Sequence, residues 1–136
     1  PTSFGMRRRV SNGYDYNRLC MLLAILEKRA GFYFANFDVY VNVVGGVKIN
    51  DTSADLPVAL ALISSLKDIP VDSYTVAFGE IGLSGEIRIS NKSDEKISEA
   101  ERLGFKRFIV PDGKYEHEHK NLEKIKNIAN LNYIFS

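Results

Sequence analysis

Apolar residues along the first half of the chain follow one helical and one strand pattern. Leucines three and four residues apart predict a helix between Asp15, its expected N-cap, and Gly31, its expected end; they stand at 19, 22, 23 and 26. Strict alternation of apolar and polar residues over 37–43 predicts a half-buried strand. Further strands are expected at 4–10 and, after a pair of glycines, at 47–49.

A second helix is predicted to start at Ser53 or beside it, because Pro57 is tolerated only in a first helical turn. The stretch 58–66 is apolar nearly all round, which is typical of a helix buried on most of its faces. The ranges 75–81 and 86–89 then predict two strands of a hairpin.

The last third of the chain predicts two more helices and two more strands. A third helix is expected from a cap at Ser93 to a stop at Gly104, followed by a strand at 105–110. The polar, amphipathic stretch 118–129 predicts a helix, and 132–135 a final strand. Short strands that alternate with helices, including a hairpin, favour an α+β fold in a single domain over 1–136.

Composition excludes several classes of protein. The net charge is +1, so no global field attracts the chain to nucleic acid, and any basic surface must be local. Cys20 is the single cysteine, which excludes an internal disulfide and a multi-cysteine zinc site. No apolar run approaches the ~18 residues that span a membrane, so a cytoplasmic protein without a membrane partner is expected. Because the chain opens at Pro1, we expect it to be a piece of a longer protein.

Two stretches, 38–66 and 79–111, resemble the proteolytic domain of Lon-type Ser/Lys peptidases. A more specific resemblance, over nearly the whole chain, is to the C-terminal Lon-protease-like domain of the bacterial RadA/Sms DNA-repair ATPase family. It rests on segments in the right order: LLAILEKRAG, NVVGGVKI, SADLPVALA, GEIGLSGEIR and ERLGFKRFIVP.

The resemblance implies a Lon peptidase-type fold, preceded in the full-length protein by a zinc finger and a RecA-like ATPase. It implies a ring, as a hexamer, that acts on single-stranded or branched DNA, with the recombinase machinery as a further partner. ATP, Mg and Zn would belong to the full-length protein. This chain has neither Cys-x-x-Cys nor a phosphate-binding loop, so no cofactor or metal is expected in it.

The resemblance sets Ser53 at a vestigial nucleophile position, or Ala54 if the preceding loop is aligned without a gap, and sets Asp94 at the lysine position. A carboxylate cannot replace the neutral amine that activates a serine. Lys96 lies two residues on, about 200° around the helix, and is expected to point away. Ser53 is then interpreted as a helix N-cap, and Asp94 with Glu95 as complements of the helix dipole.

We therefore expect a non-catalytic scaffold domain that builds the ring and contributes DNA contacts. Two alternatives stay open. One is a working peptidase that uses Ser53 with a lysine recruited from elsewhere, such as Lys92 or Lys96. The other is an oligomerisation module without a nucleic-acid role.

The predicted DNA-binding residues are basic side chains on strands. Lys48 and Arg88 have apolar neighbours on both sides, so their heads are expected to face outward. The cluster Arg7, Arg8 and Arg9 is expected to help, with Arg8 partly buried because it shares a strand face with Val10. Isolated solvent-facing charges are the alternative for each residue, and Glu80 and Glu86 are expected to weaken the surface. The pair His117 and His119 is interpreted as part of a solvated loop and not as a metal site.

Overall fold

The computed structural model describes residues 7–43, 51–89 and 92–135. Their helices and mixed parallel and antiparallel strands confirm the α+β class. The strands are β1 (Arg9–Asn12), β2 (Val39–Asn42), β3 (Thr75–Ala77), β4 (Glu80–Ile81), β5 (Ile87–Arg88), β6 (Arg107–Pro111) and β7 (Leu122–Ile125). The helices are α1 (Tyr16–Ala30), α2 (Asp55–Lys67), α3 (Ser93–Arg102) and α4 (Leu131–Ile134), with 3₁₀ turns η2 (Thr52–Ala54) and η3 (Ile128–Asn130).

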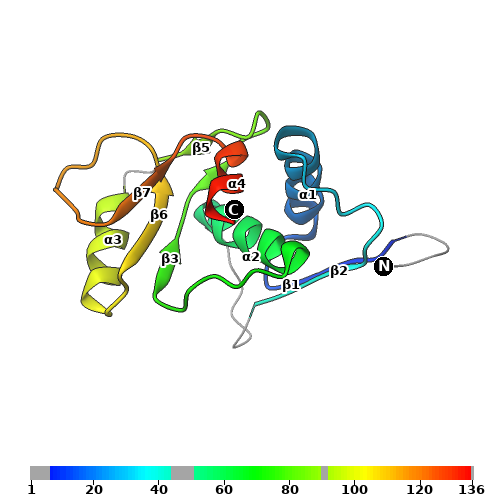
Figure 1. The fold of residues 1–136 in the computed structure, drawn as a ribbon, viewed down its shortest axis with the longest axis horizontal. Coiled ribbons are helices and arrows are strands. Elements are labelled where there is room, and N and C mark those ends of the chain that lie inside the picture. Colours follow the sequence, from blue (N-terminus) through cyan, green and yellow to red (C-terminus); the bar gives the residue numbers. More distant parts are fainter. Residues whose placement is uncertain (1–6, 44–50, 90–91, 136) are drawn as a thin grey trace.

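The helix α2 lies in the middle of the molecule (Figure 1). On one side is the parallel sheet β3-β6-β7 with α3 beyond it, and on the other are α1 and the parallel pair β1-β2. The strands β4 and β5 form the predicted hairpin as an antiparallel pair. This central position explains why the sequence of α2 is apolar nearly all round.

Residues of β6 alternate between two apolar clusters. Ile109 packs into the larger cluster with α1, α2 and α4, whereas Phe108 and Val110 pack with Ile97 of α3 in a smaller one. Successive side chains of a strand point to opposite faces, so both faces of the sheet are buried here. The continuous apolar run of β6 follows from this burial.

The predicted ends of α1 are confirmed. The Asp15 carboxylate accepts a hydrogen bond from the Arg18 backbone N–H at 2.9 Å, and Gly31 closes the helix in the left-handed region at φ +75°. In α2, Pro57 occupies the first turn as predicted. The predicted strand 75–81 is divided at Gly79, whose backbone bonds to the start of α2: its N–H donates to the Ser53 carbonyl at 2.8 Å, and its carbonyl accepts from Leu56 at 3.0 Å.

Two predictions for the last third are wrong. The range 118–129 holds the strand β7 and the turn η3 instead of a helix, and 132–135 falls largely in α4 instead of a strand. Leu122 and Ile125 are spaced like residues of one helix face, but parallel pairing with β6 satisfies the backbone of this segment. Pairing with a distant strand therefore overrides the local pattern.

The predicted strand at 4–10 lies partly outside the described residues, and the one at 47–49 wholly outside them. Ser93 does not cap α3; it is the first helical residue and is buried, and the preceding Lys92 makes no side-chain capping bond. Gly104 follows the end of α3 at φ +96°, as predicted.

Candidate functional site

Ser53 lies in the η2 turn that leads into α2. The residue that caps this turn is Asp51, whose carboxylate accepts the Ser53 backbone N–H at 2.9 Å. The interpretation of Ser53 as the N-cap is therefore wrong, because the cap is supplied two residues earlier. This leaves the Ser53 hydroxyl available for another partner.

That partner is Lys96. Its Nζ lies 2.6 Å from Ser53 Oγ and 2.9 Å from Asp51 Oδ2, and 5.6 Å from the centre of the Phe78 ring. The expectation that Lys96 points away from Ser53 is wrong. Asp94 and Lys96 do diverge, as two residues on a helix must, but it is Lys96 that faces the turn.

The electrostatics of this group are those of an ion pair. The Ser53 backbone N–H, together with the Lys96 amine, lowers the pKa of Asp51 to about 2. Lys96 and Asp51 form this ion pair, with 2.9 Å between Nζ and Oδ2. A lysine that activates a serine must be neutral and desolvated, whereas this side chain is 30% exposed. The Ser53 hydroxyl and the Lys96 amine therefore lie within hydrogen-bonding distance of each other, with the amine also paired to Asp51.

Asp94, which the resemblance sets at the position of the catalytic lysine, faces the chain segment that precedes β7. Its carboxylate accepts the backbone N–H groups of Glu116 at 2.9 Å and His117 at 3.1 Å, and lies 2.8 Å from His119 Nε2. These hydrogen bonds, with that from Glu116 the largest contribution, lower the pKa of Asp94 to about 2. Asp94 thus does more than complement a helix dipole: it attaches a loop to α3.

A buried carboxylate that the sequence did not single out is Asp55, which is 1% exposed. It accepts hydrogen bonds from the Tyr14 hydroxyl at 2.7 Å, from Arg18 Nε at 2.6 Å and from the Ile81 backbone N–H at 3.0 Å. Burial, followed by the Asp55 hydrogen bond, raises the pKa of Tyr14. The signal in the sequence that could have identified Asp55 was an acidic residue at the start of an otherwise apolar helix. Its role is structural, since it joins α1, α2 and β4.

The predicted DNA-binding arginines at the start of β1 and just before it have different surroundings. The Arg9 guanidinium donates to the backbone carbonyls of Phe34 at 2.9 Å and Phe37 at 2.5 Å, so it supports the segment before β2. Arg8 is exposed, and Val10 is 37% exposed. The expectation that Arg8 is partly buried is therefore wrong, because that face of the strand is not covered. Arg7 is half-buried.

Arg88 faces outward as predicted, with 54% of its side chain exposed, but it forms ion pairs with Glu86 at 3.0 Å and Glu80 at 3.4 Å. Both carboxylates offset its charge, as expected. Lys48 lies outside the described residues. Among the described residues, therefore, Arg9 and Arg88 both have partners within the chain.

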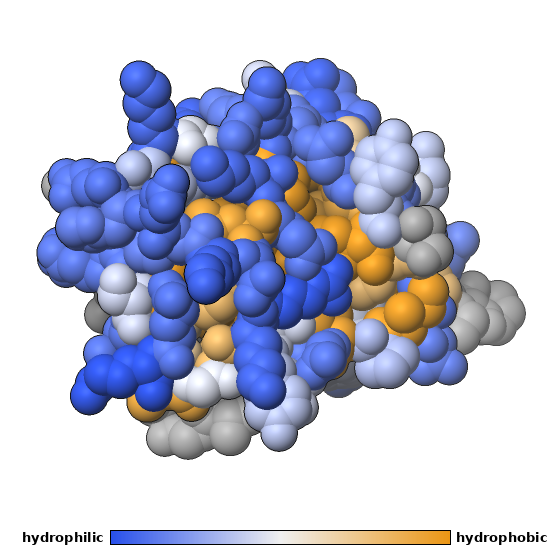
Figure 2. Space-filling view, turned by 60° about the vertical axis from the view of Figure 1, so that its left-hand side comes forward, coloured by the Kyte–Doolittle hydropathy of each residue, from blue (hydrophilic) through white to orange (hydrophobic). Residues whose placement is uncertain are grey.

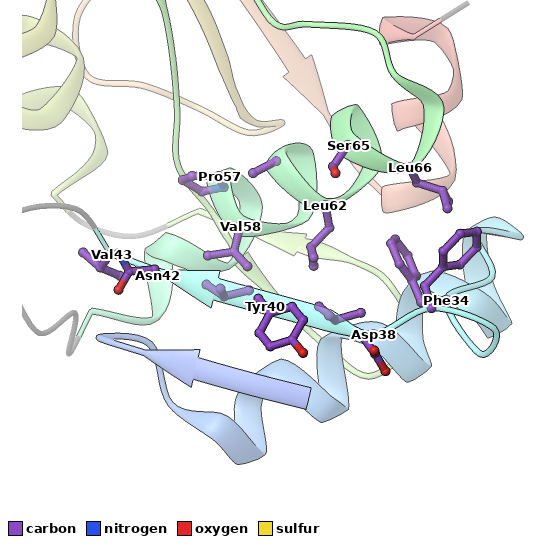
Figure 3. Close-up of a pocket in the computed structure, with 14 residues that line it drawn as sticks. Phe34, Asp38, Tyr40, Asn42, Val43, Pro57, Val58, Leu62, Ser65 and Leu66 are labelled. Carbon is purple, nitrogen blue, oxygen red and sulfur yellow. The ribbon is translucent and has the colours of Figure 1, made fainter. Parts of the chain in front are cut away.

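An open hollow of about 550 Å³ lies between β2 and α2. Figure 3 shows Phe34, Tyr40, Val58 and Leu62 among the side chains around it, with Asp38 at its rim. Its lining is mainly aliphatic and aromatic, with Asp38, Asn42 and Ser65 among its polar residues.

The described residues contain no group of three or more histidine, cysteine, aspartate or glutamate side chains that could hold a metal ion. Within the same residues, no helix is long and apolar enough to cross a membrane.

Comparison with known proteins gives one matching family and a set of close relatives. The model of a family described as subunit ChlI of Mg-chelatase matches residues 21–114. The DNA repair protein RadA of Haemophilus influenzae is 55% identical over 106 residues, 78% of this chain and 23% of that protein. RadA of Escherichia coli is 54% identical over 104 residues, 76% of this chain and 23% of the relative. RadA of Synechocystis is 42% identical over 125 residues, 92% of this chain and 25% of the relative. The chain spans about a quarter of the length of these proteins.

Proposed function

The chain belongs to the family described as subunit ChlI of Mg-chelatase, and from this premise and its similarity to RadA DNA repair proteins we propose that it is a non-catalytic, Lon-like domain of a RadA-like DNA repair protein. In this role it contributes to a ring-shaped oligomer and supplies DNA contacts. Hydrolysis of ATP, with its Mg, and binding of Zn are assigned to other parts of such a protein.

The absence of peptidase activity is proposed on one observation, the pairing of Lys96 with Asp51. Lys96 Nζ lies 2.9 Å from the Asp51 carboxylate, so an ion pair engages the amine that a Ser/Lys peptidase needs free to accept the serine proton. Removal of a base from such a pair costs several orders of magnitude in rate.

Self-association is supported by aromatic side chains at the surface. The segment 32–37 divides its aromatic residues between two environments: Phe32 and Phe34 are buried, whereas Tyr33 is 62% and Phe37 38% exposed. Figure 2 shows apolar side chains gathered on one face of the molecule between hydrophilic ones. Aromatic residues are enriched at protein interfaces, and a net charge of +1 does not oppose contact between copies.

DNA contact is proposed chiefly through the exposed Arg8 and, from the sequence, Lys48, with Arg88 contributing less because Glu80 and Glu86 neutralise it. Because the surface has only a small number of basic groups, it can neutralise only a small number of phosphates. DNA binding should therefore be weak, independent of sequence and sensitive to salt. A ring would strengthen it by avidity.

A second candidate function, a Ser53-dependent peptidase, is favoured by the 2.6 Å distance between Ser53 Oγ and Lys96 Nζ. The two candidates are separated by incubating the protein with an unfolded protein substrate and following its fragmentation. We expect no turnover. Fragmentation that is abolished in Ser53→Ala and in Lys96→Met, but retained in the control Ser65→Ala, would show that the peptidase is the function.

The DNA role is tested by fluorescence anisotropy with a labelled single-stranded oligonucleotide at several salt concentrations. The variant Arg8→Gln/Lys48→Gln should bind more weakly and with a shallower salt dependence, by roughly 0.7 per lost phosphate contact. The matched control is Lys114→Gln/Lys120→Gln, which removes the same two positive charges from the loop between β6 and β7, at the opposite end of the molecule from β1 (Figure 1). Equal loss in both variants would mean that only net charge matters, and no loss in either would favour the scaffold without a DNA role.

A further inference from the structure

His119 lies in the loop between β6 and β7, here called the 112–121 loop. Its imidazole is almost completely covered, with 3% of the side chain exposed, whereas His117 and most other residues of the loop are exposed, as expected for a solvated loop. Both ring nitrogens face carboxylates of α3: Nε2 lies 2.8 Å from Asp94 Oδ1 and Nδ1 lies 2.9 Å from Glu101 Oε1.

This geometry specifies the charge of the ring. An ionised carboxylate only accepts hydrogen bonds, and a neutral imidazole carries a single N–H. One of the two contacts would then set a nitrogen lone pair against a carboxylate oxygen. Asp94 cannot relieve the conflict by protonation near neutral pH, because its pKa is about 2. Both contacts are favourable only when His119 is an imidazolium.

Two aromatic rings are the other neighbours of the His119 imidazole. The rings of Tyr115 and His117 lie edge-on, with centres 6.2 Å and 6.4 Å from that of His119. The Tyr115 hydroxyl donates to the Pro111 carbonyl at 2.5 Å, and burial raises its pKa, so this neighbour stays neutral near neutral pH. The charges that act on His119 are therefore the two α3 carboxylates.

We propose that His119 is a proton-operated latch, which holds the 112–121 loop on α3 while the imidazole is charged and releases the loop when the imidazole loses its proton. The same surface of α3 receives two further bonds from the loop, the backbone N–H groups of Glu116 and His117 on Asp94. Release uncovers the acidic pair Asp94 and Glu101 on α3.

The pH dependence follows from the direction of the shift. Burial lowers the pKa of His119, but the hydrogen bonds and charges of Asp94 and Glu101 outweigh it and raise the pKa above the ordinary histidine value. The latch is therefore closed below the pKa of the unfolded chain and opens as pH rises through the folded pKa. This behaviour does not depend on the proposed DNA role.

The test uses the 136-residue chain, whose two histidines give two imidazole signals in a proton–carbon NMR spectrum. The variant His117→Gln leaves one signal and assigns it to His119. The titration midpoint of His119 should lie above that of the same signal in urea. In Glu101→Gln, which keeps the size of the side chain, the midpoint should move down.

Hydrogen exchange measures the release itself. Above the His119 midpoint, the amides of Glu116 and His117 should exchange at least about threefold faster than intrinsic base catalysis predicts, since a charge-assisted contact is lost. The control is a buried amide of α2, at Ile63, which should follow the global stability. In His119→Gln the excess should disappear. A midpoint that does not move between native and unfolded states, or loop amides that exchange in parallel with Ile63, would overturn the proposal.

Discussion

Replacement of Asp55 by asparagine tests the buried network that joins α1, α2 and β4. The change keeps the size of the side chain, but sets an NH₂ group where an oxygen accepts hydrogen bonds. One carboxylate oxygen receives the Tyr14 hydroxyl and Arg18 Nε, and the other receives the Ile81 N–H and the second Arg18 nitrogen. Whichever way the amide is turned, donors then face donors.

The structure sets the size of the effect. The carboxylate is 1% exposed, while 24% of the Arg18 side chain reaches solvent, so the cation can recover some hydration. Breaking a buried charge pair by changing one partner costs about 3–5 kcal/mol. With an unfolding entropy of about 2.1 cal/mol/K per residue, such a loss lowers the melting temperature of a chain of this length by roughly 10–17 °C.

The assay is urea and thermal unfolding followed by far-ultraviolet circular dichroism. Asp15→Asn is the matched control: it makes the same chemical change at an exposed cap that asparagine also fills, and should cost less than about 0.5 kcal/mol. Tyr14→Phe removes one donor and should cost about 1 kcal/mol. A loss below about 1 kcal/mol in Asp55→Asn would refute the reasoning, since it would mean that the network contributes nothing beyond packing.

Three further outcomes are expected. Arg9→Gln should lower the free energy of unfolding by about 1–2 kcal/mol through its lost bonds to carbonyls, whereas Arg8→Gln should leave urea unfolding unchanged. Gly85→Ala should destabilise more than Gly104→Ala in thermal melts: both have positive φ, but an added Cβ meets side-chain atoms at 3.0 Å only at the first. The pKa of Asp51 lies below its unfolded value, so its contribution to stability is present above pH 4 and is lost as pH falls toward 2; acid titration of unfolding should show a weaker dependence in Asp51→Asn.

Local signals in the sequence determined the helices whose ends are marked by a capping residue, a proline or a glycine. Asp15 and Gly31 delimit α1, Pro57 marks the first turn of α2, and Gly104 follows the end of α3. In each case the side chain, or its absence, acts on backbone within a few residues, so the pattern predicts the structure without knowledge of the rest of the chain.

Where the local pattern of a segment fits both a helix and a strand, tertiary contacts decided which of the two it forms. The stretch around Leu122 and Ile125 has a helical spacing of apolar residues, yet it forms β7 because β6 offers a parallel partner beside it in the sheet. A short segment gains more from completing a sheet than from an isolated helical turn, and that partner is invisible to a local pattern.

The candidate site shows the same division at the level of single side chains. The sequence determined that Asp94 and Lys96 point in different directions, because helix geometry fixes the angle between them. It did not determine which of the two faces Ser53, since the rotation of α3 about its own axis is set by packing of Ile97 and Ala100 against the sheet. That packing directs Lys96 to Ser53 and Asp51, and Asp94 to His119. The angle between two side chains of one helix follows from local helix geometry. The partner that each side chain contacts depends on the whole fold.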